Sequence, residues 1–189
     1  MAKQIEGVSD RLLEIAQAEF LQKGFAEASL RTIAENAGTS TGSIYTRFGD
    51  KNGLFTAIVG PVAEGFIGMY QEELASFNQG EPKTVEQMLR HTAGKLNMTV
   101  DAIYDHFEAF KLLICRAEGS TYEDFLHRLS GIEAEQTERY IRWIHSDVLE
   151  SGRLSRALLH MLTVSSPVFA AESVYPPSSA MVSYSCGNA

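Results

Sequence analysis

Residues 29 to 55, SLRTIAENAGTSTGSIYTRFGDKNGLF, constrain the fold of this chain more than its composition does. Two short helical patterns are joined at a glycine, and the start of a third helix follows. Ile33, Ala34 and Ala37 recur at helical spacing and should face inward. Gly38 lies where the chain must reverse, and we expect it at positive φ, a conformation that costs glycine little. The stretch therefore predicts two helices joined by a tight turn.

The second of these helices should present one face to solvent. Ser40 is expected to cap it, because its side-chain oxygen can accept a hydrogen bond from a free backbone N–H. Ile44 and Phe48 are four residues apart and should face inward. The residues left facing outward are Gly42, Ser43, Tyr45 and Thr46. This is the arrangement of a helix-turn-helix, whose second helix enters the major groove of DNA.

The outward residues and their flanks are candidates for contact with DNA. Thr41, Gly42 and Thr46 are short, so the backbone can approach base edges, and a threonine methyl can touch a thymine methyl. The Tyr45 hydroxyl suits a phosphate oxygen, and Lys51 adds an ammonium near a helix N-terminus. Plain surface roles remain open for several of these side chains. The predicted DNA-binding residues are Arg31, Ser40, Thr41, Gly42, Tyr45, Thr46 and Lys51.

The stretch resembles a known family, the TetR (tetracycline-repressor-type) transcription regulators. The shared marks are KGF after the first helix, TIAENAG, TGSIYTRF and the DK that opens the next helix, over about residues 9 to 59. Gly53 departs from the pattern, which often has a glutamate there. The resemblance implies an all-α fold, with an N-terminal three-helix DNA-binding domain and a larger helical domain for ligand binding and dimerisation. It also implies a homodimer on a palindromic operator, a tyrosine and a lysine that anchor phosphates, and release by a small, largely apolar effector.

The rest of the chain predicts further helices and three regions. The helices are expected at about 9–23, 30–37, 41–47, 51–77, from 84, over 101–119, at 122–150 and at 154–164, with a loop at 78–82. Leu13, Ala16 and Phe20 should form the inner stripe of the first helix. We expect a DNA-binding domain at 1–52, an effector-binding and dimerisation domain at 53–166, and an atypical, poorly ordered tail at 167–189 that weakens the dimer.

Methionine and aromatic side chains are frequent between residues 66 and 125. Such stripes are usually plain core, whereas the resemblance implies that some of them line an effector cavity. The candidates are Phe66, Met69, Tyr70, Met88, His91, Tyr104, Phe107, Phe110, Tyr122 and Phe125. In the helix that begins near Thr84, the side expected to face inward carries Met88, Leu89, Thr92 and Leu96.

Charge and composition exclude some classes. The net charge of −8 is unusual for a DNA-binding protein, but residues 29 to 51 are mildly basic. Apolar runs fall short of the roughly 18 residues that a membrane span needs, and the N-terminus has no signal-peptide core. Cys115 and Cys186 have neither metal nor redox spacing. These features indicate a cytoplasmic protein with no membrane partner.

Catalytic motifs are missing from the sequence, which predicts that the protein is not an enzyme and needs no cofactor or metal site. Two alternatives to an effector-controlled regulator stay open. One is a helical ligand-binding protein whose DNA binding is impaired, given the acidic net charge. The other is a metal-responsive regulator, for which His91, His106 and His127 supply ligand types without a recognised spacing.

Overall fold

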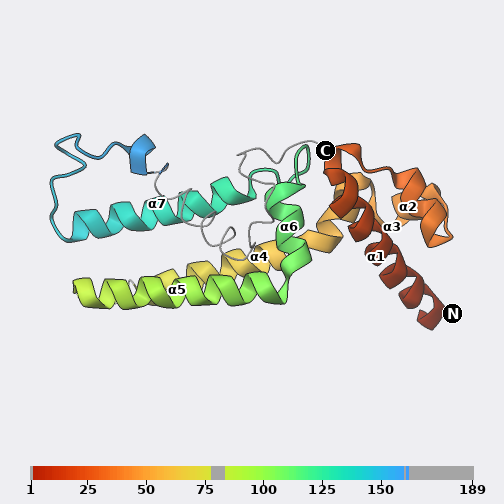
Figure 1. The fold of residues 1–189 in the computed structure, drawn as a ribbon, viewed down its shortest axis with the longest axis horizontal. Helices are drawn as coiled ribbons and strands as arrows, with labels where there is room; N and C mark the ends of the chain where they lie inside the picture. The colour runs from red at the N-terminus through yellow and green to blue at the C-terminus, as the bar shows by residue number, and fades with distance from the viewer. Residues whose placement is uncertain (1, 78–83, 160, 162–189) are drawn as a thin grey trace, which may run out of the picture. The chain divides into compact units, whose positions relative to one another are not determined.

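The computed structural model describes residues 2–77, 84–159 and 161, and within these ranges the chain forms helices and no strands (Figure 1). The helices are α1 (Ala2–Glu27), α2 (Leu30–Ala37), α3 (Thr41–Phe48), α4 (Lys51–Phe77), α5 (Val85–Asp105), α6 (Phe107–Cys115) and α7 (Phe125–Trp143). Residues 156–159 and 161 are also helical. The predicted all-α class is confirmed. The loop expected at 78–82 and the tail expected at 167–189 lie outside the described residues.

The chain divides into two compact units. The first contains Met1–Gly65 and His106–Phe125, and the second contains Phe66–Asp105 and the chain from Leu126 onward. Helix α4 therefore begins in one unit and ends in the other. This division differs from the boundary expected at residue 52, because the first half of α4 supplies core side chains to the first unit.

An aromatic cluster forms the centre of the first unit. The ring of Phe55, from α4, lies edge-on to Phe20 at 5.1 Å and to Phe25 at 5.2 Å between centroids. Phe20 and Phe55 are fully buried. Such pairs contribute beyond the apolar area that they bury. The cluster therefore fixes the end of α1 against the start of α4.

Helix α1 differs from its prediction at both ends and in its inner stripe. It begins at Ala2, earlier than the expected residue 9. Its helical geometry breaks at Gly24, with φ 78° and ψ 163°, close to the predicted end. Leu12 is fully buried together with Ala16 and Phe20, whereas Leu13 is partly exposed. Leu12 therefore replaces the predicted Leu13 in the inner stripe, because the buried residues of α1 recur every four positions.

Helix α4 has the predicted bounds of 51–77. By length and composition alone it could cross a membrane, which corrects the expectation that no segment would. Its side chains Leu54, Phe55 and Val59 are fully buried within the protein. A core helix of a globular protein has the same length and composition, and α4 packs as one.

Helix α5 starts with a capping box. The Thr84 Oγ1 accepts from the Gln87 N–H at 3.2 Å, and the Gln87 Oε1 accepts from the Thr84 N–H at 2.8 Å. The predicted inner face of this helix is wrong, because Leu89 and Leu96 are 67% and 51% exposed. The side that contacts α4 and α7 instead carries polar residues such as Lys95. The prediction placed the apolar residues of α5 inside, but ionisable side chains occupy its inner face, so the predicted face was wrong.

Two longer predicted helices are shorter or divided. The region expected at 101–119 splits at His106, whose φ of −129° and ψ of 39° separate α5 from α6. The helix expected over 122–150 spans only Phe125–Trp143. It is followed by His145, a non-glycine residue with φ 52°. Turns at His106 and after Trp143 therefore end these helices, although the amphipathic pattern of the sequence continues beyond both positions.

Candidate nucleic-acid interface

Helix α2 is closed at both ends by local hydrogen bonds. The Ser29 Oγ accepts from the Thr32 N–H at 3.4 Å at the N-terminus. Gly38 follows the helix with φ 67° and ψ 34°, and its N–H bonds the Glu35 carbonyl. The positive φ expected at Gly38 is confirmed. This left-handed residue turns the chain so that a second helix can start three residues later, at Thr41.

Helix α3 is the predicted recognition helix, and its cap is confirmed. Ser40 has extended backbone geometry, and its Oγ accepts from the Ser43 N–H at 3.2 Å. Ile44 is fully buried, as expected, and Phe48 is half-buried. Gly49, at φ 80°, ends the helix and donates its N–H to the Tyr45 carbonyl at 2.9 Å. One buried face and two caps therefore fix the orientation of this short helix.

The opposite face of α3 is open to solvent. Gly42 and Thr46 are exposed, and the Tyr45 side chain is 54% exposed. The Thr46 Oγ1 donates to the Gly42 carbonyl at 2.8 Å, which orients its side chain along the helix. Thr41 and Ser43 are half-buried at the edge of this face. The structure thus brings the predicted outward residues of α3 onto one surface.

Arg31 and Lys51 are held by the protein in different ways. The Arg31 Nε lies 2.9 Å from the Glu35 Oε1 in an exposed pair on α2. The Lys51 Nζ donates to the carbonyls of Ala26 at 2.9 Å and Ala28 at 3.3 Å. It also lies 4.7 Å from the centre of the Phe25 ring. An ammonium has three N–H donors, so one donor of Lys51 is left for a phosphate.

Two residues next to Lys51 were not among the predicted site residues. The Asp50 Oδ1 accepts from the Gly53 N–H at 2.7 Å and so caps the start of α4. The Asn52 Oδ1 accepts from both the N–H of Thr121, at 3.1 Å, and its hydroxyl, at 3.3 Å. The aspartate follows a glycine at a helix start, which is a readable capping signal. The Asn52 contact joins residues far apart in sequence and has no such signal.

The residues proposed to line an effector pocket are distributed over both units. Phe110, Tyr122 and Phe125 are buried in the first unit, and Phe107 belongs to it as well. In the second unit, Phe66 and Tyr70 are buried, Met88 is half-buried, and Met69 and Tyr104 are exposed. His91 lines a cavity of about 410 Å³ in the second unit. The shared pocket of these ten residues stays a prediction.

Comparison with known proteins adds to this geometry. Residues 12–58 match the family model described as "Bacterial regulatory proteins, tetR family". The HTH-type transcriptional repressor KstR2 of Rhodococcus jostii (strain RHA1) is 33% identical over 146 residues, which are 77% of this chain and 65% of that protein. KstR2 of Mycolicibacterium smegmatis (strain ATCC 700084 / mc(2)155) is 26% identical over 143 residues, 76% of this chain and 63% of that protein.

The alignments thus span a little under two thirds of the length of each of these two relatives. Among solved structures, native NalD of Pseudomonas aeruginosa, the secondary repressor of the MexAB-OprM multidrug efflux pump, aligns over 87% of this chain and 96% of that one, with 20% identity and a TM-score of 0.48. The family match covers α2, α3, most of α1 and the start of α4. The region that the family model matches therefore contains the capped pair of helices and its exposed face.

Proposed function

Because the chain belongs to the tetR family of bacterial regulatory proteins, we propose that it regulates transcription by binding double-stranded DNA at a palindromic operator. The observation that carries this proposal is the exposed face of α3, which a buried Ile44 and the Ser40 cap hold in one orientation. A helix presented in this way fits the major groove. Its relatives are named transcriptional repressors, and we propose repression for this protein too.

The predicted DNA-binding residues of α3 and of its neighbouring helices have separate roles in this proposal. Thr46 and Gly42 face base edges, and the methyl of Thr46 meets a thymine methyl. Tyr45 and the remaining donor of Lys51 bind phosphates, which position the helix without reading sequence. Arg31 adds a further phosphate contact from α2 once it leaves Glu35. The ion pair of Arg31 costs little to break, since both of its side chains are exposed and such pairs are screened by solvent.

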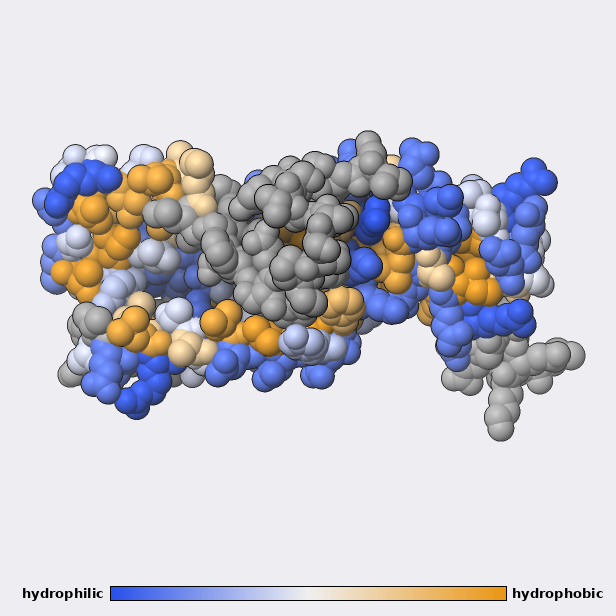
Figure 2. Space-filling view, viewed as in Figure 1, coloured by the Kyte–Doolittle hydropathy of each residue, from blue (hydrophilic) through white to orange (hydrophobic). Residues whose placement is uncertain are grey.

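We propose that the protein acts as a homodimer, whose two α3 helices lie in successive major grooves about 34–36 Å apart. Exposed apolar side chains after α7 support self-association: Ile144, Leu158 and Met161. Figure 2 shows apolar surface over the end of α7 and the segment that follows it. Exposed apolar patches often mark protein interfaces. Analytical ultracentrifugation over a concentration series would test the dimer, and a monomer at every concentration would contradict it.

We propose that a small-molecule effector bound in the second unit shifts the protein away from its DNA-binding form, in the cytoplasm. The effector can do this only through different affinities for the two forms. The cavity at His91, about 410 Å³ and open to solvent, supports such a site because aromatic and charged side chains line it together. The contacts of α4 in both units support this helix as the link.

The proposal is tested by selecting tight binders from a random double-stranded DNA library with the full-length protein. A regulator of this kind should enrich a palindrome, which is then titrated by fluorescence anisotropy at several salt concentrations. Thr46→Ala should lose roughly 1 kcal/mol or more of discrimination between the selected site and random DNA. Glu72→Gln, at an exposed position of α4 in the second unit, is the matched control. Failure to enrich any sequence would favour the alternative, a helical ligand-binding protein that does not read DNA.

A further inference from the structure

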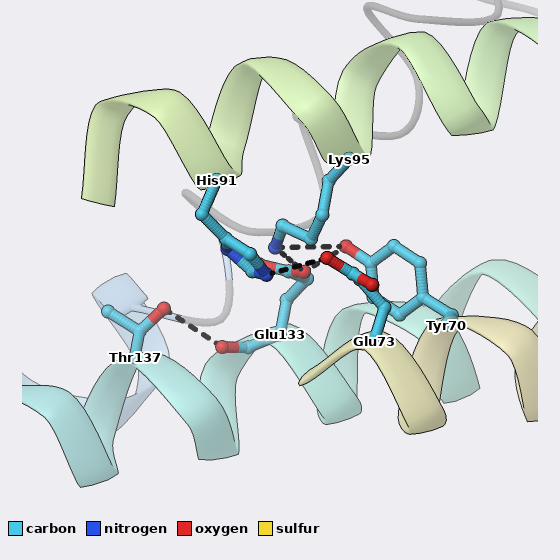
Figure 3. A network of polar contacts seen from close by, with 6 residues as sticks. All are labelled: Tyr70, Glu73, His91, Lys95, Glu133 and Thr137. Atoms are coloured by element: carbon cyan, nitrogen blue, oxygen red, sulfur yellow. Dashed lines mark hydrogen bonds and ion pairs between the residues drawn. The ribbon is translucent and has the colours of Figure 1, made fainter. Parts of the chain in front are cut away.

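A cluster of ionisable side chains joins three helices of the second unit (Figure 3). Lys95 of α5 donates to the Glu133 Oε1 of α7 at 2.5 Å and to the Tyr70 hydroxyl of α4 at 3.4 Å. The Tyr70 hydroxyl donates to the same Glu133 oxygen. Two donors thus converge on one carboxylate oxygen. This is the geometry by which proteins recognise an oxyanion.

The charges of this cluster are held away from water. The side chains of Lys95 and Glu133 are 13% and 15% exposed. Burial lowers the pKa of Lys95 to about 8 and raises the pKa of Glu133 to about 7. A buried pair of this kind is weak evidence for stability, because desolvation offsets much of the attraction. Packing alone gives no reason for charged groups at this position.

A cavity that is open to solvent lies next to the cluster, and its wall reaches the polar network of Figure 3 through Glu73 and His91 rather than through Tyr70, Lys95 or Glu133. Glu73 and His91, both drawn in Figure 3, belong to its wall, which also contains Ser76, Phe77, Gln87, Arg90 and Gly94. The His91 ring stacks on Phe77, with centroids 3.8 Å apart. The cavity wall therefore offers a flat aromatic surface at the side of the cluster.

His91 also has a ring nitrogen that lies at ion-pair distance from Glu73 but makes no hydrogen bond. Its side chain is 8% exposed, and its Nε2 is buried without a hydrogen bond, 3.5 Å from the Glu73 Oε1. Burial and the nearby charge of Lys95 lower the pKa of His91, while Glu73 raises it, with a net lowering. A buried polar atom without a hydrogen bond is uncommon and needs an explanation. A polar group of a bound molecule in the cavity would satisfy it.

We propose that this cavity binds a small molecule with a flat apolar part and a carboxylate or similar oxyanion, which replaces the Glu133 carboxylate on Lys95 and Tyr70. In the absence of that molecule, Glu133 occupies the oxyanion position. The flat part of the molecule lies against Phe77 and His91. Glu73, whose side chain is 47% exposed, turns toward solvent to admit the anion.

The cluster favours an anion over a cation. Lys95 without Glu133 would be a buried cation that needs an acceptor, and a ligand oxyanion supplies one. Glu133 can leave at smaller cost, because a carboxyl with a pKa of about 7 takes up a proton near neutral pH. Departure of Glu133 also removes the two hydrogen bonds that it accepts from Tyr70 of α4 and Lys95 of α5. An effect of this change on DNA binding rests on the proposed function, whereas binding of the small molecule to the cavity does not.

Isothermal titration calorimetry of the full-length protein with phenylacetate and phenylacetamide tests the site. The two probes share a ring and differ in the charge of the polar end. Phenylacetate should bind about tenfold or more tightly, because only it gives Lys95 a charged acceptor. Equal affinities, or binding of neither probe at millimolar concentration, would overturn the proposal.

Three variants separate recognition from a structural role. Glu133→Gln should tighten phenylacetate about tenfold, because the internal competitor is gone, and leave phenylacetamide unchanged. Lys95→Met should abolish the preference for the acid. Glu138→Gln is the matched control, because Glu138 is another paired glutamate of α7 but its partners are Arg142 and Arg156. Weaker binding of both probes to Glu133→Gln would show that the pair only holds the helices together.

Titration of the selected DNA in the presence of each probe distinguishes this proposal from the proposed function. Phenylacetate that binds with the expected preference but leaves DNA affinity unchanged supports the site and contradicts control by an effector. Release of DNA by both probes alike, with Lys95→Met unchanged, supports control by an effector and contradicts the oxyanion site.

Discussion

Replacing Lys51 with methionine separates two roles of this residue. Methionine keeps the apolar stem but removes the ammonium, which donates to the Ala26 and Ala28 carbonyls and lies over the Phe25 ring. Each hydrogen bond contributes about 0.5–1 kcal/mol at a partly accessible position. The contact with the ring adds about 0.5–1 kcal/mol. The free energy of unfolding should therefore fall by about 2 kcal/mol.

Thermal unfolding followed by circular dichroism measures this loss. For a chain of this size, about 2 kcal/mol corresponds to a decrease in Tm of about 4–8 °C. Lys23→Met is the matched control, because Lys23 is an exposed lysine on α1. The control should melt within about 1 °C of the wild type, as surface substitutions usually do. A Lys51→Met variant with the Tm of the wild type would refute the structural role.

The same variant tests the contact with phosphate. If the third donor of Lys51 binds DNA, the slope of log affinity against log salt concentration should become shallower by about 0.9. Affinity should also fall about equally for the selected site and for random DNA. If Lys51 only stabilises the fold, the slope of the folded variant should equal that of the wild type. An unchanged slope, measured well below the Tm, would remove Lys51 from the DNA-binding residues.

Four further substitutions test the caps and the packing of the first unit. Ser40→Ala should lower the free energy of unfolding by about 1 kcal/mol and weaken DNA binding, because it removes the capping hydrogen bond of 3.2 Å. An unchanged Tm and unchanged DNA affinity would contradict the role of the cap. Gly53→Ala should lower the free energy of unfolding by more than about 1 kcal/mol, since the added Cβ would collide with the Phe48 carbonyl oxygen. Gly42→Ala should be tolerated, because only the Ser40 Oγ lies near the added Cβ, at 3.7 Å. Equal melting of the two alanine variants would refute the collision. Phe55→Ala should lower the free energy of unfolding by about 3–5 kcal/mol, because the ring is fully buried against the rings of Phe20 and Phe25. A loss under about 1 kcal/mol in denaturant titration would show that the aromatic cluster is not central to stability.

The helix-turn-helix could be predicted from the sequence because its determinants are local. Ser29 and Ser40 each bond a backbone N–H three residues ahead, and Gly38 acts through its own φ. Interactions over so short a distance depend little on the rest of the fold. The bounds of α2 and α3 were therefore predicted to within one residue, and the buried positions Ile33 and Ile44 followed from spacing alone.

The partners of ionisable side chains could not be predicted in this way. Lys51 bonds carbonyls 23 and 25 residues away, and Lys95 bonds a carboxylate 38 residues away. The sequence shows that a lysine is charged, and a charge favours an exposed position. It does not show which hydrogen-bond acceptor from a distant part of the chain will lie next to that lysine. The inner face of α5 was mispredicted for this reason, with Leu89 assigned to the face that Lys95 occupies.

The sequence by itself thus determined the helical class, the two caps and the exposed face of α3, because each depends on residues within one or two turns of helix. Only the tertiary structure decided that the start of α4 joins the first unit, and that Tyr70, Lys95 and Glu133 meet beside a cavity. These features depend on which helices pack together. That choice is made by the burial of side chains distant in sequence, such as Phe20 and Phe55, and no local pattern records it.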